Sequence, residues 1–200
     1  MAWVNPATVA TGDVLTASKW NQDVVENTSV LPRVISSGAV TTSAISIPSA
    51  ADYALLRISL VWRSSRAAAV NDQPALRFNG DSGSNYDALY AWVNNAADNR
   101  AEQRAQSSAV LGFMNAVNAT TSFFATHEIT IPDPGGTTAF KTGTHTNGWG
   151  QTTSTNEMFA GHGWFQWRNT AAITSITFLT LNSASFITGS VYAITGYPFA

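Results

Sequence analysis

The sequence contains no cysteine. Disulfides, thiolate-bound metals and cysteine nucleophiles are therefore excluded, and the fold must be stable through packing alone. Charged residues are also scarce: they make up 11% of the 200 residues, less than half of the roughly 25% that is usual. The formal net charge is −2, and no run of Lys or Arg offers the basic surface that nucleic acid binding requires. We therefore expect no nucleic acid partner and a surface made soluble by neutral polar groups.

Long apolar runs are missing as well. No window approaches the ~18 apolar residues of a membrane span, so we expect no membrane insertion. The opening MAWVNPATVATGD lacks the basic start and the apolar run of a signal peptide. We accordingly expect synthesis in the cytoplasm and, if the protein leaves the cell, a route other than secretion.

Catalytic and cofactor motifs are not found in the sequence: it has no GxSxG elbow, Walker loop, HExxH or GxGxxG. The three histidines, His127, His145 and His162, match no zinc spacing, and we interpret them as ordinary polar or packed side chains. The segment DSGSNYD (81–87) fails the calcium-loop pattern because its glycine stands third instead of sixth, so a β-turn is the simpler interpretation. We predict no enzyme activity, metal or cofactor, although carboxylates that meet only in space stay open as an alternative.

The first part of the chain carries the signals of a helix start. In TGDVLTASKWNQDVVEN (11–27), Thr16 is a good N-cap, and Asp13 adds negative charge just before the helix. Leu15 and Trp20 have the spacing of a hydrophobic staple, which fixes the direction in which the chain enters a helix.

The same segment has one apolar stripe. Trp20, Val24 and Leu31 continue one face, and Pro32 ends the pattern. We predict a helix over about residues 16–31, which is marginal alone and therefore needs a partner for its stripe. That partner is another subunit or, alternatively, the β-domain of the same chain.

From Arg33 onward the apolar pattern changes to period two. The clearest strand has an apolar face formed by Ala54, Leu56, Ile58, Leu60 and Trp62. Further strands are predicted at 39–47, 75–78, 88–93, 109–114, 122–131, 157–168, 173–181 and 186–197. Turn-rich segments separate them at 79–85, 132–136 and 142–151.

About eight or nine strands without a helix between them predict an all-β antiparallel sandwich over residues 33–200, with a jelly roll as the leading form. Residues 1–32 are predicted as a separate N-terminal docking segment. Residues 94–108 hold most of the local charge, and we predict a short helix or an exposed loop there.

The tryptophans indicate where the β-domain could meet a ligand. Trp62 fits the core face of its strand, whereas Trp149 lies in a glycine-rich segment where burial is less assured. Trp164 and Trp167 lie in one strand on opposite faces, so one belongs to the core and the other can face a partner. Exposed aromatic rings among Asn and Gly are typical of sugar-binding platforms and of subunit interfaces. Trp149, Trp164 and Trp167 are therefore a possible ligand platform, with core packing as the alternative for each.

The opening WVNPATVATGDVLTASKWNQDVVENTSVL (3–31) resembles the start of tail proteins of tailed bacteriophages. Those proteins typically begin with Trp-x-x-Pro, then Gly-Asp/Glu, two hydrophobic residues, Thr-Ala, an Asn, and an acidic-Asn pair before a Leu. The matching positions are Trp3, Pro6, Gly12, Asp13, Val14, Leu15, Thr16, Ala17, Asn21, Glu26, Asn27 and Leu31. The segments 76–90 and 186–197 are also similar to phage β-domains. The chain departs from the pattern at Lys19-Trp20, where smaller or aliphatic residues are usual.

The resemblance implies a structural component of the virion, assembled in the host cytoplasm: a tail or neck appendage with a projecting β-domain. The contacts to the particle or between subunits would come from Trp3, Leu15, Trp20, Val24 and Leu31. Such proteins are often trimers, so the resemblance implies a homotrimer with other phage virion proteins as partners. A capsid decoration protein and a receptor-recognition module that binds a host-surface glycan stay open. A depolymerase fits less well, because no sequence repeat is found.

Overall fold

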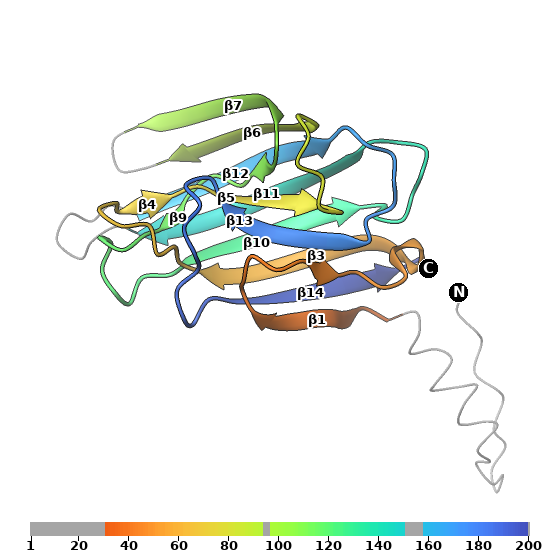
Figure 1. Ribbon diagram of the computed structural model, residues 1–200, viewed down its shortest axis with the longest axis horizontal. Helices are drawn as coiled ribbons and strands as arrows, with labels where there is room; N and C mark the ends of the chain where they lie inside the picture. Colours follow the sequence, from red (N-terminus) through yellow and green to blue (C-terminus); the bar gives the residue numbers. More distant parts are fainter. Residues whose placement is uncertain (1–30, 94–96, 151–157, 200) are drawn as a thin grey trace, which may run out of the picture.

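The computed structural model describes residues 31–93, 97–150 and 158–199. These residues form antiparallel β-strands and one 3₁₀ turn, Ala50–Asp52 (Figure 1). The strands are β1 (Arg33–Ala39), β2 (Ile45–Ser46), β3 (Tyr53–Trp62), β4 (Asn71–Asp72), β5 (Pro74–Phe78), β6 (Tyr86–Val93), β7 (Asp98–Gln106), β8 (Ala109–Val110), β9 (Met114–Asn115), β10 (Ala125–Pro132), β11 (Lys141–Gly150), β12 (Met158–Trp167), β13 (Ser175–Thr180) and β14 (Val191–Pro198).

The predicted N-terminal helix lies almost wholly outside the described residues, as do Trp3, Leu15, Trp20 and Val24. Of the predicted contact residues, Leu31 is described, and about half of its surface is exposed.

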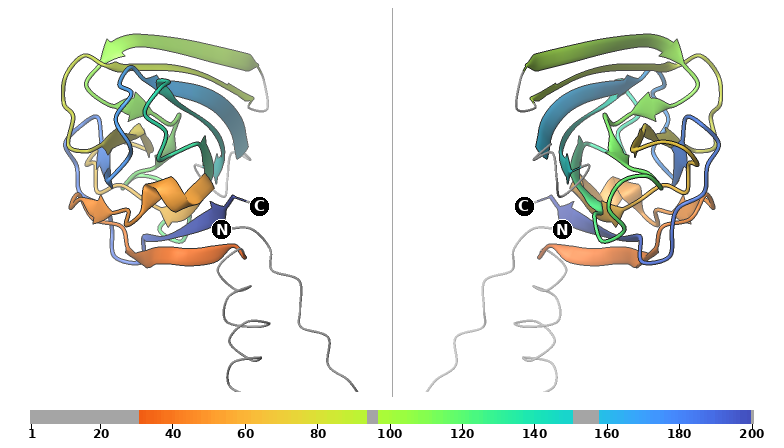
Figure 2. Two further views of the ribbon diagram at one scale, coloured as in Figure 1. Left: turned by 90° about the vertical axis from the view of Figure 1, so that its right-hand side faces the viewer. Right: turned by 90° about the vertical axis from the view of Figure 1, so that its left-hand side faces the viewer.

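The strands form two main layers. The large sheet has eight strands in the order β1-β14-β3-β10-β11-β12-β6-β7, and the small sheet has four in the order β2-β13-β5-β8. The pair β4-β9 stands beside them. Figure 2 shows the large sheet curving around the small one, so that one of its faces encloses the core and the other faces outward. The predicted all-β antiparallel architecture is confirmed, and its form is consistent with a sandwich.

In both sheets, strands from the beginning of the described chain pair with strands from its end. The first strand, β1, pairs with the last, β14, and β2 pairs with β13. The hairpins β6-β7 and β11-β12 then extend the large sheet beyond β10. In these hairpins β6 and β12 were expected, whereas β7 and β11 were not; the other unexpected strands are β1, β4 and β9.

The core is aromatic and lies between the two sheets. Trp62 of β3 contacts Phe178 of β13 with ring centroids 5.7 Å apart, and Phe78 of β5 contacts Phe165 of β12 at 6.1 Å. All four side chains are fully buried, as is Leu56, so the alternation predicted for β3 is confirmed. Burying each such side chain is worth roughly 1.5–3 kcal/mol, which compensates for the absence of disulfides.

The prediction of a turn-rich segment over 142–151 is wrong for residues 142–150, which belong to the long strand β11. Glycines of β11 and of its neighbour β12 do not bend the chain; they leave space for large side chains of the opposite strand. A Cβ atom added to Gly143 would stand 2.3 Å from Phe165, and one added to Gly163 would stand 2.3 Å from His145. Each glycine therefore lies beneath a large side chain of its cross-strand partner.

We expect the substitution Gly163→Ala to destabilise the protein by about 1–3 kcal/mol, because the new methyl group overpacks the space of His145 and of the Leu89 carbonyl. The matched control is Gly148→Ala on the outer side of β11, where the nearest atom lies at an ordinary 3.5 Å. Urea unfolding would measure both variants. Equal stability of the two variants would contradict the packing role of Gly163.

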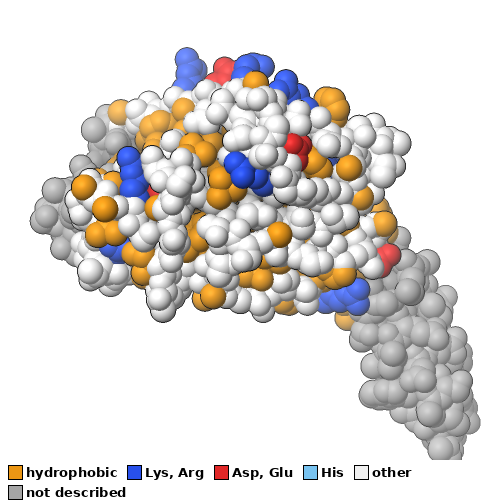
Figure 3. Space-filling view, in the orientation of Figure 1, with side chains coloured by type: hydrophobic (Ala, Val, Ile, Leu, Met, Phe, Trp, Pro, Cys, Tyr) orange, Lys and Arg blue, Asp and Glu red, His pale blue; other side chains and the backbone are white. Residues whose placement is uncertain are grey.

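The prediction of a helix or loop over 94–108 is also wrong where the structure describes it, because residues 98–106 form β7 at the edge of the large sheet. Arg100, Glu102 and Arg104 are exposed, whereas Ala101 between them is partly buried against the core. Figure 3 shows basic and acidic side chains gathered along this edge, at the top of the view. Such alternating charges on an edge strand discourage pairing with another chain. The high local charge, from which we predicted a loop or helix, therefore belongs to an exposed edge strand.

Candidate interaction face

The outer face of the large sheet, which we define as the side chains that point away from the small sheet, is not covered by another sheet in the described residues. Strand register places side chains from six strands in one line across it. This cross-strand row consists of Arg57 (β3), Thr130 (β10), Thr144 (β11), Trp164 (β12), Leu89 (β6) and Glu102 (β7). Because neighbouring strands lie about 4.8 Å apart, the part from Arg57 to Leu89 spans about 19 Å.

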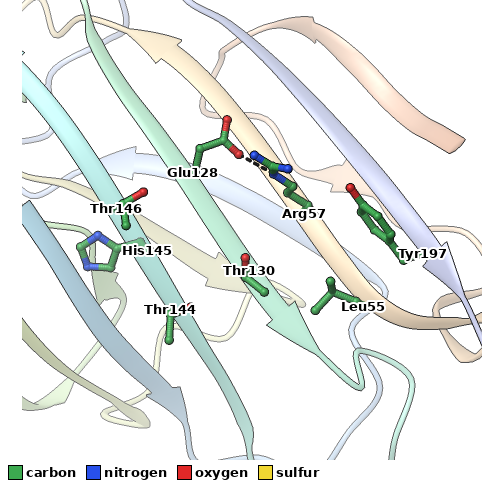
Figure 4. Close-up of a pocket in the computed structure, with 8 residues that line it drawn as sticks. All are labelled: Leu55, Arg57, Glu128, Thr130, Thr144, His145, Thr146 and Tyr197. Atoms are coloured by element: carbon green, nitrogen blue, oxygen red, sulfur yellow. Dashed lines mark hydrogen bonds and ion pairs between the residues drawn. The ribbon is translucent and has the colours of Figure 1, made fainter. Parts of the chain in front are cut away.

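One end of the row forms a shallow hollow around Arg57. Figure 4 shows Arg57 beside Glu128 of the neighbouring strand, and the Arg57 Nε atom donates to the Glu128 carboxylate at 2.9 Å. This bond, and a weaker one to Tyr197, raise the pKa of Arg57. The hollow encloses about 320 Å³, and Thr130, Thr144 and Thr146 line it with hydroxyl groups. The pair is half exposed, so it contributes little to stability and remains open to a ligand.

The other end forms a second hollow around the Trp164 indole, which we call the Trp164 hollow. It encloses about 230 Å³ and is lined, among others, by Leu89, Gln166, Glu102 and Arg104. Glu102 and Arg104 form an exposed ion pair with each other. The hollow therefore combines an apolar ring with polar and paired charged groups at its rim.

The structure does not bring the three candidate platform tryptophans together. Trp167 is buried and donates its indole N–H to Asp81 at 2.7 Å. Trp149 is also buried and stacks on Phe159, with ring centroids 3.8 Å apart. Trp164 is 38% exposed and stands on the outer face. The predicted opposite orientation of Trp164 and Trp167 is confirmed, and of the three only Trp164 can act as an open platform.

The histidines are divided between the two faces of the large sheet. His127 and His145 are buried on the inner face, with ring centroids 6.3 Å apart, whereas His162 is exposed on the outer face. The Trp62 indole donates to Nδ1 of His127 at 2.8 Å, and Nε2 of His127 donates to the Leu111 carbonyl at 2.9 Å. Both ring nitrogens of His145 lack a hydrogen-bond partner. Burial lowers the pKa of His127 to about 3 and that of His145 to about 4, so both are neutral in the fold.

Residues 81–85 form the predicted turn, residues 86 and 87 begin β6, and the Asp81 carboxylate binds groups within the protein. The oxygens of Asp81 accept hydrogen bonds from the Gly83 N–H, the Asn85 amide and the Trp167 indole. The Trp167 bond is the main reason why the pKa of Asp81 is lowered. Across residues 31–93, 97–150 and 158–199, no group of three or more His, Asp or Glu is arranged to hold a metal ion.

Sequence patterns did not indicate the other members of the face. Arg57, Glu128 and Gln166 occupy alternate strand positions, which marks them as outward-facing but not as neighbours of one another. Pairing of β3 with β10 brings Arg57 beside Glu128, and pairing of β12 with β6 brings Gln166 beside Leu89, in both cases from segments more than 60 residues apart in the chain.

No protein-family model matches this chain, and no curated protein matches it either. In the part of the chain that the structure describes, no helix is long and apolar enough to cross a membrane. The candidate function therefore depends on the chemistry of the outer face and on the opening segment.

Proposed function

We propose that this chain is a structural protein of a tailed-bacteriophage virion, a tail or neck appendage that docks through residues 1–32 and projects its β-domain. The observation that carries the proposal is the opening segment, whose motif and apolar stripe resemble phage tail proteins. The β-domain is consistent with this role because its two sheets enclose one hydrophobic core, while no other described strand covers the outer face of its large sheet. The appendage is a homotrimer, and other virion proteins are its partners.

The β-domain is a jelly roll with two added hairpins. The order β1-β14-β3-β10 against β2-β13-β5-β8 supports this, because it pairs outermost strands with each other and then the next strands inward, as two interlocked Greek keys require. The hairpins β6-β7 and β11-β12 widen one of the two sheets. They also carry the Trp164 hollow, so the widening creates a surface that a bare eight-stranded jelly roll lacks.

The head acts by binding and not by catalysis. The charged side chains that line the two hollows are held in pairs, Arg57 with Glu128, Arg104 with Glu102 and Arg168 with Asp87. No carboxylate on this row stands alone as a general acid or base would. Recognition of the host surface is the second role that this face supports, through the exposed Trp164.

Deletion of residues 1–32 is expected to abolish incorporation into the particle and to convert a trimer into monomers, while the β-domain stays folded. The physical reason is that burying three or four apolar side chains per chain, each worth roughly 1.5–3 kcal/mol, drives docking of the segment. Particles from cells that express the truncated chain would be assayed for the protein, and its mass would be measured in solution.

A pair of variants separates the apolar stripe from the rest of the segment. Trp20→Ala with Val24→Ser should reproduce the deletion, whereas Lys19→Ala with Glu26→Ala, on the other faces of the predicted helix, should not. Normal incorporation of the truncated chain would overturn the docking proposal. Labelled copies that decorate the head of the particle would assign a capsid role instead of a tail role.

A further inference from the structure

We propose that the cross-strand row binds a neutral oligosaccharide, with one pyranose ring stacked on Trp164. This inference rests on the proposed function, which leaves the outer face of the head accessible on the particle. It goes further by naming the ligand class, the site and the residue that anchors it.

Trp164 has the setting of a stacking platform. Trp164 stands on the outer face between Leu89 and Thr144, its register partners on the two neighbouring strands, and the residue is 38% exposed. By contrast, Trp62, Trp149 and Trp167 are buried on the inner face. A pyranose ring has an apolar C–H face and a polar rim, so it can cover the indole while its hydroxyl groups stay hydrogen-bonded.

The side chains around the ring have hydrogen-bonding capacity that the fold does not use. Among the described residues, the hydroxyls of Thr130 and Thr144 and the amide of Gln166 make no side-chain hydrogen bond. Sugar hydroxyls both donate and accept, so they match hydroxyl and amide groups, which also do both. Binding would therefore satisfy groups that are otherwise solvated, at spacings set by the rigid sheet.

The length and charge of the row define the ligand further. The span of about 19 Å from Arg57 to Leu89 is longer than one sugar ring, so an oligosaccharide lying across the strands would occupy both hollows. On β3, β10, β11, β12 and β14, the formally charged side chains of the outer face are Arg57 and Glu128, which neutralise each other. At the other end Glu102 pairs with Arg104, and Asp87, which also lines the Trp164 hollow, pairs with Arg168. The charged side chains that line the two hollows are therefore all paired within the protein, which favours neutral sugars over sialylated or uronic-acid glycans.

The test uses the full-length protein on an array that holds neutral bacterial surface oligosaccharides together with acidic counterparts. We expect binding to at least one neutral glycan, with an affinity that changes little between low and high salt, because no ion pair forms with the ligand. Trp164→Ala should weaken this binding about tenfold or more, and Trp164→Phe should retain part of it. Thr144→Val, which removes a hydroxyl at similar volume, should weaken it several-fold.

The control is Met158→Ala, which removes a more exposed apolar side chain from the same face of the same strand. It should leave glycan binding unchanged. Absence of any signal on the array, equal binding by the Trp164→Ala and Met158→Ala variants, or binding that requires an acidic glycan and fails at high salt would each overturn the inference. A change of oligomeric state in Trp164→Ala would also overturn it, because the face would then be a contact between copies.

Failure here is distinguishable from failure of the proposed function. Particles that carry Trp164→Ala should contain the normal amount of protein but adsorb less to host cells. If they adsorb normally, the saccharide site is wrong and the appendage role stands. If the chain without residues 1–32 still enters particles, the docking role is wrong, whereas glycan binding by Trp164 is unaffected.

Discussion

Replacing Arg63 with Met is expected to destabilise the protein by about 3–5 kcal/mol. Arg63 follows β3 directly and is 2% exposed. Its guanidinium donates to the carbonyls of Val117, Ala119, Thr120 and Phe123, and so holds the loop between β9 and β10. No carboxylate among the described residues pairs with it. Burial lowers the pKa of Arg63, but the side chain stays charged, so carbonyl dipoles alone balance a buried cation.

The loss of stability in Arg63→Met comes from the backbone carbonyls that the guanidinium no longer binds. Four carbonyls lose a donor at once, and among the described residues only that of Thr120 keeps another, the Phe123 N–H. A buried acceptor without a partner, as the Ala119 carbonyl becomes, costs about 1–3 kcal/mol. The matched control is Arg57→Met on the same strand, whose ion pair is half exposed and contributes about 0–1 kcal/mol. Urea unfolding curves of both variants would give the free energies of unfolding. A loss for Arg63→Met as small as for Arg57→Met would show that the loop does not depend on the guanidinium.

Acidification from pH 6.5 to about 4 is expected to remove several kcal/mol of stability. His127 and His145 are neutral in the fold, with pKa values of about 3 and about 4, whereas an unfolded histidine has a pKa near 6.5. The unfolded chain therefore binds protons first, so stability is full above pH 6.5 and falls as the pH drops towards the folded pKa values. Each histidine contributes on the order of 3 kcal/mol by pH 4. Asp81, whose pKa is lowered, adds its effect only below its ordinary 3.8.

The variant His145→Met isolates one of the two histidines. Its side chain fills the space above Gly163 without the two ring nitrogens that lack partners, so stability at pH 7 should be unchanged or higher. The decrease in the free energy of unfolding between pH 6.5 and 4.5 should become smaller by the contribution of His145. In the variant His162→Gln, which replaces an exposed histidine, most of this decrease in unfolding free energy should remain. Unfolding free energies that stay flat from pH 7 to 4.5 in the unmodified protein would contradict the burial of neutral histidines.

The sequence predicted β-strands correctly where one face of the strand is apolar and the other is polar. The predicted alternation matches the buried face of β3 from Leu56 to Trp62, and the turn over 79–85 uses Asn79 and Gly80 at positive φ. Both features are local, because side-chain alternation and turn chemistry depend on a few consecutive residues. The all-β architecture follows from repeating such signals along the chain.

Predictions from the sequence were wrong where one residue type can serve two structural purposes. Glycines in β11 and β12 resemble turn residues, yet Gly143 and Gly163 lie beneath Phe165 and His145 in the register of the strand pair. Only knowledge of the partner strand separates these two uses of glycine. The same holds for Arg63, whose role as a buried cation depends on a loop more than 50 residues away.

The candidate site was partly predictable for the same reason. Trp164 could be proposed from its strand position, because two tryptophans three residues apart must point to opposite faces. Its neighbours Leu89 and Thr144 come from strands that are distant in sequence, and strand order alone brings them together. Site residues on a wide sheet therefore depend on topology, which period-two patterns do not encode.

The pairing of β1 with β14 has a consequence for synthesis. Strand β3 also pairs with β14, and β2 pairs with β13, so neither layer can close until the last strands have left the ribosome. Nascent chains would expose unpaired edges throughout translation, which makes them substrates for chaperones and prone to aggregation. A premature stop before Val191 would leave β1 without its neighbour and β3 with an open side, and such a product should be degraded instead of accumulating as a smaller domain.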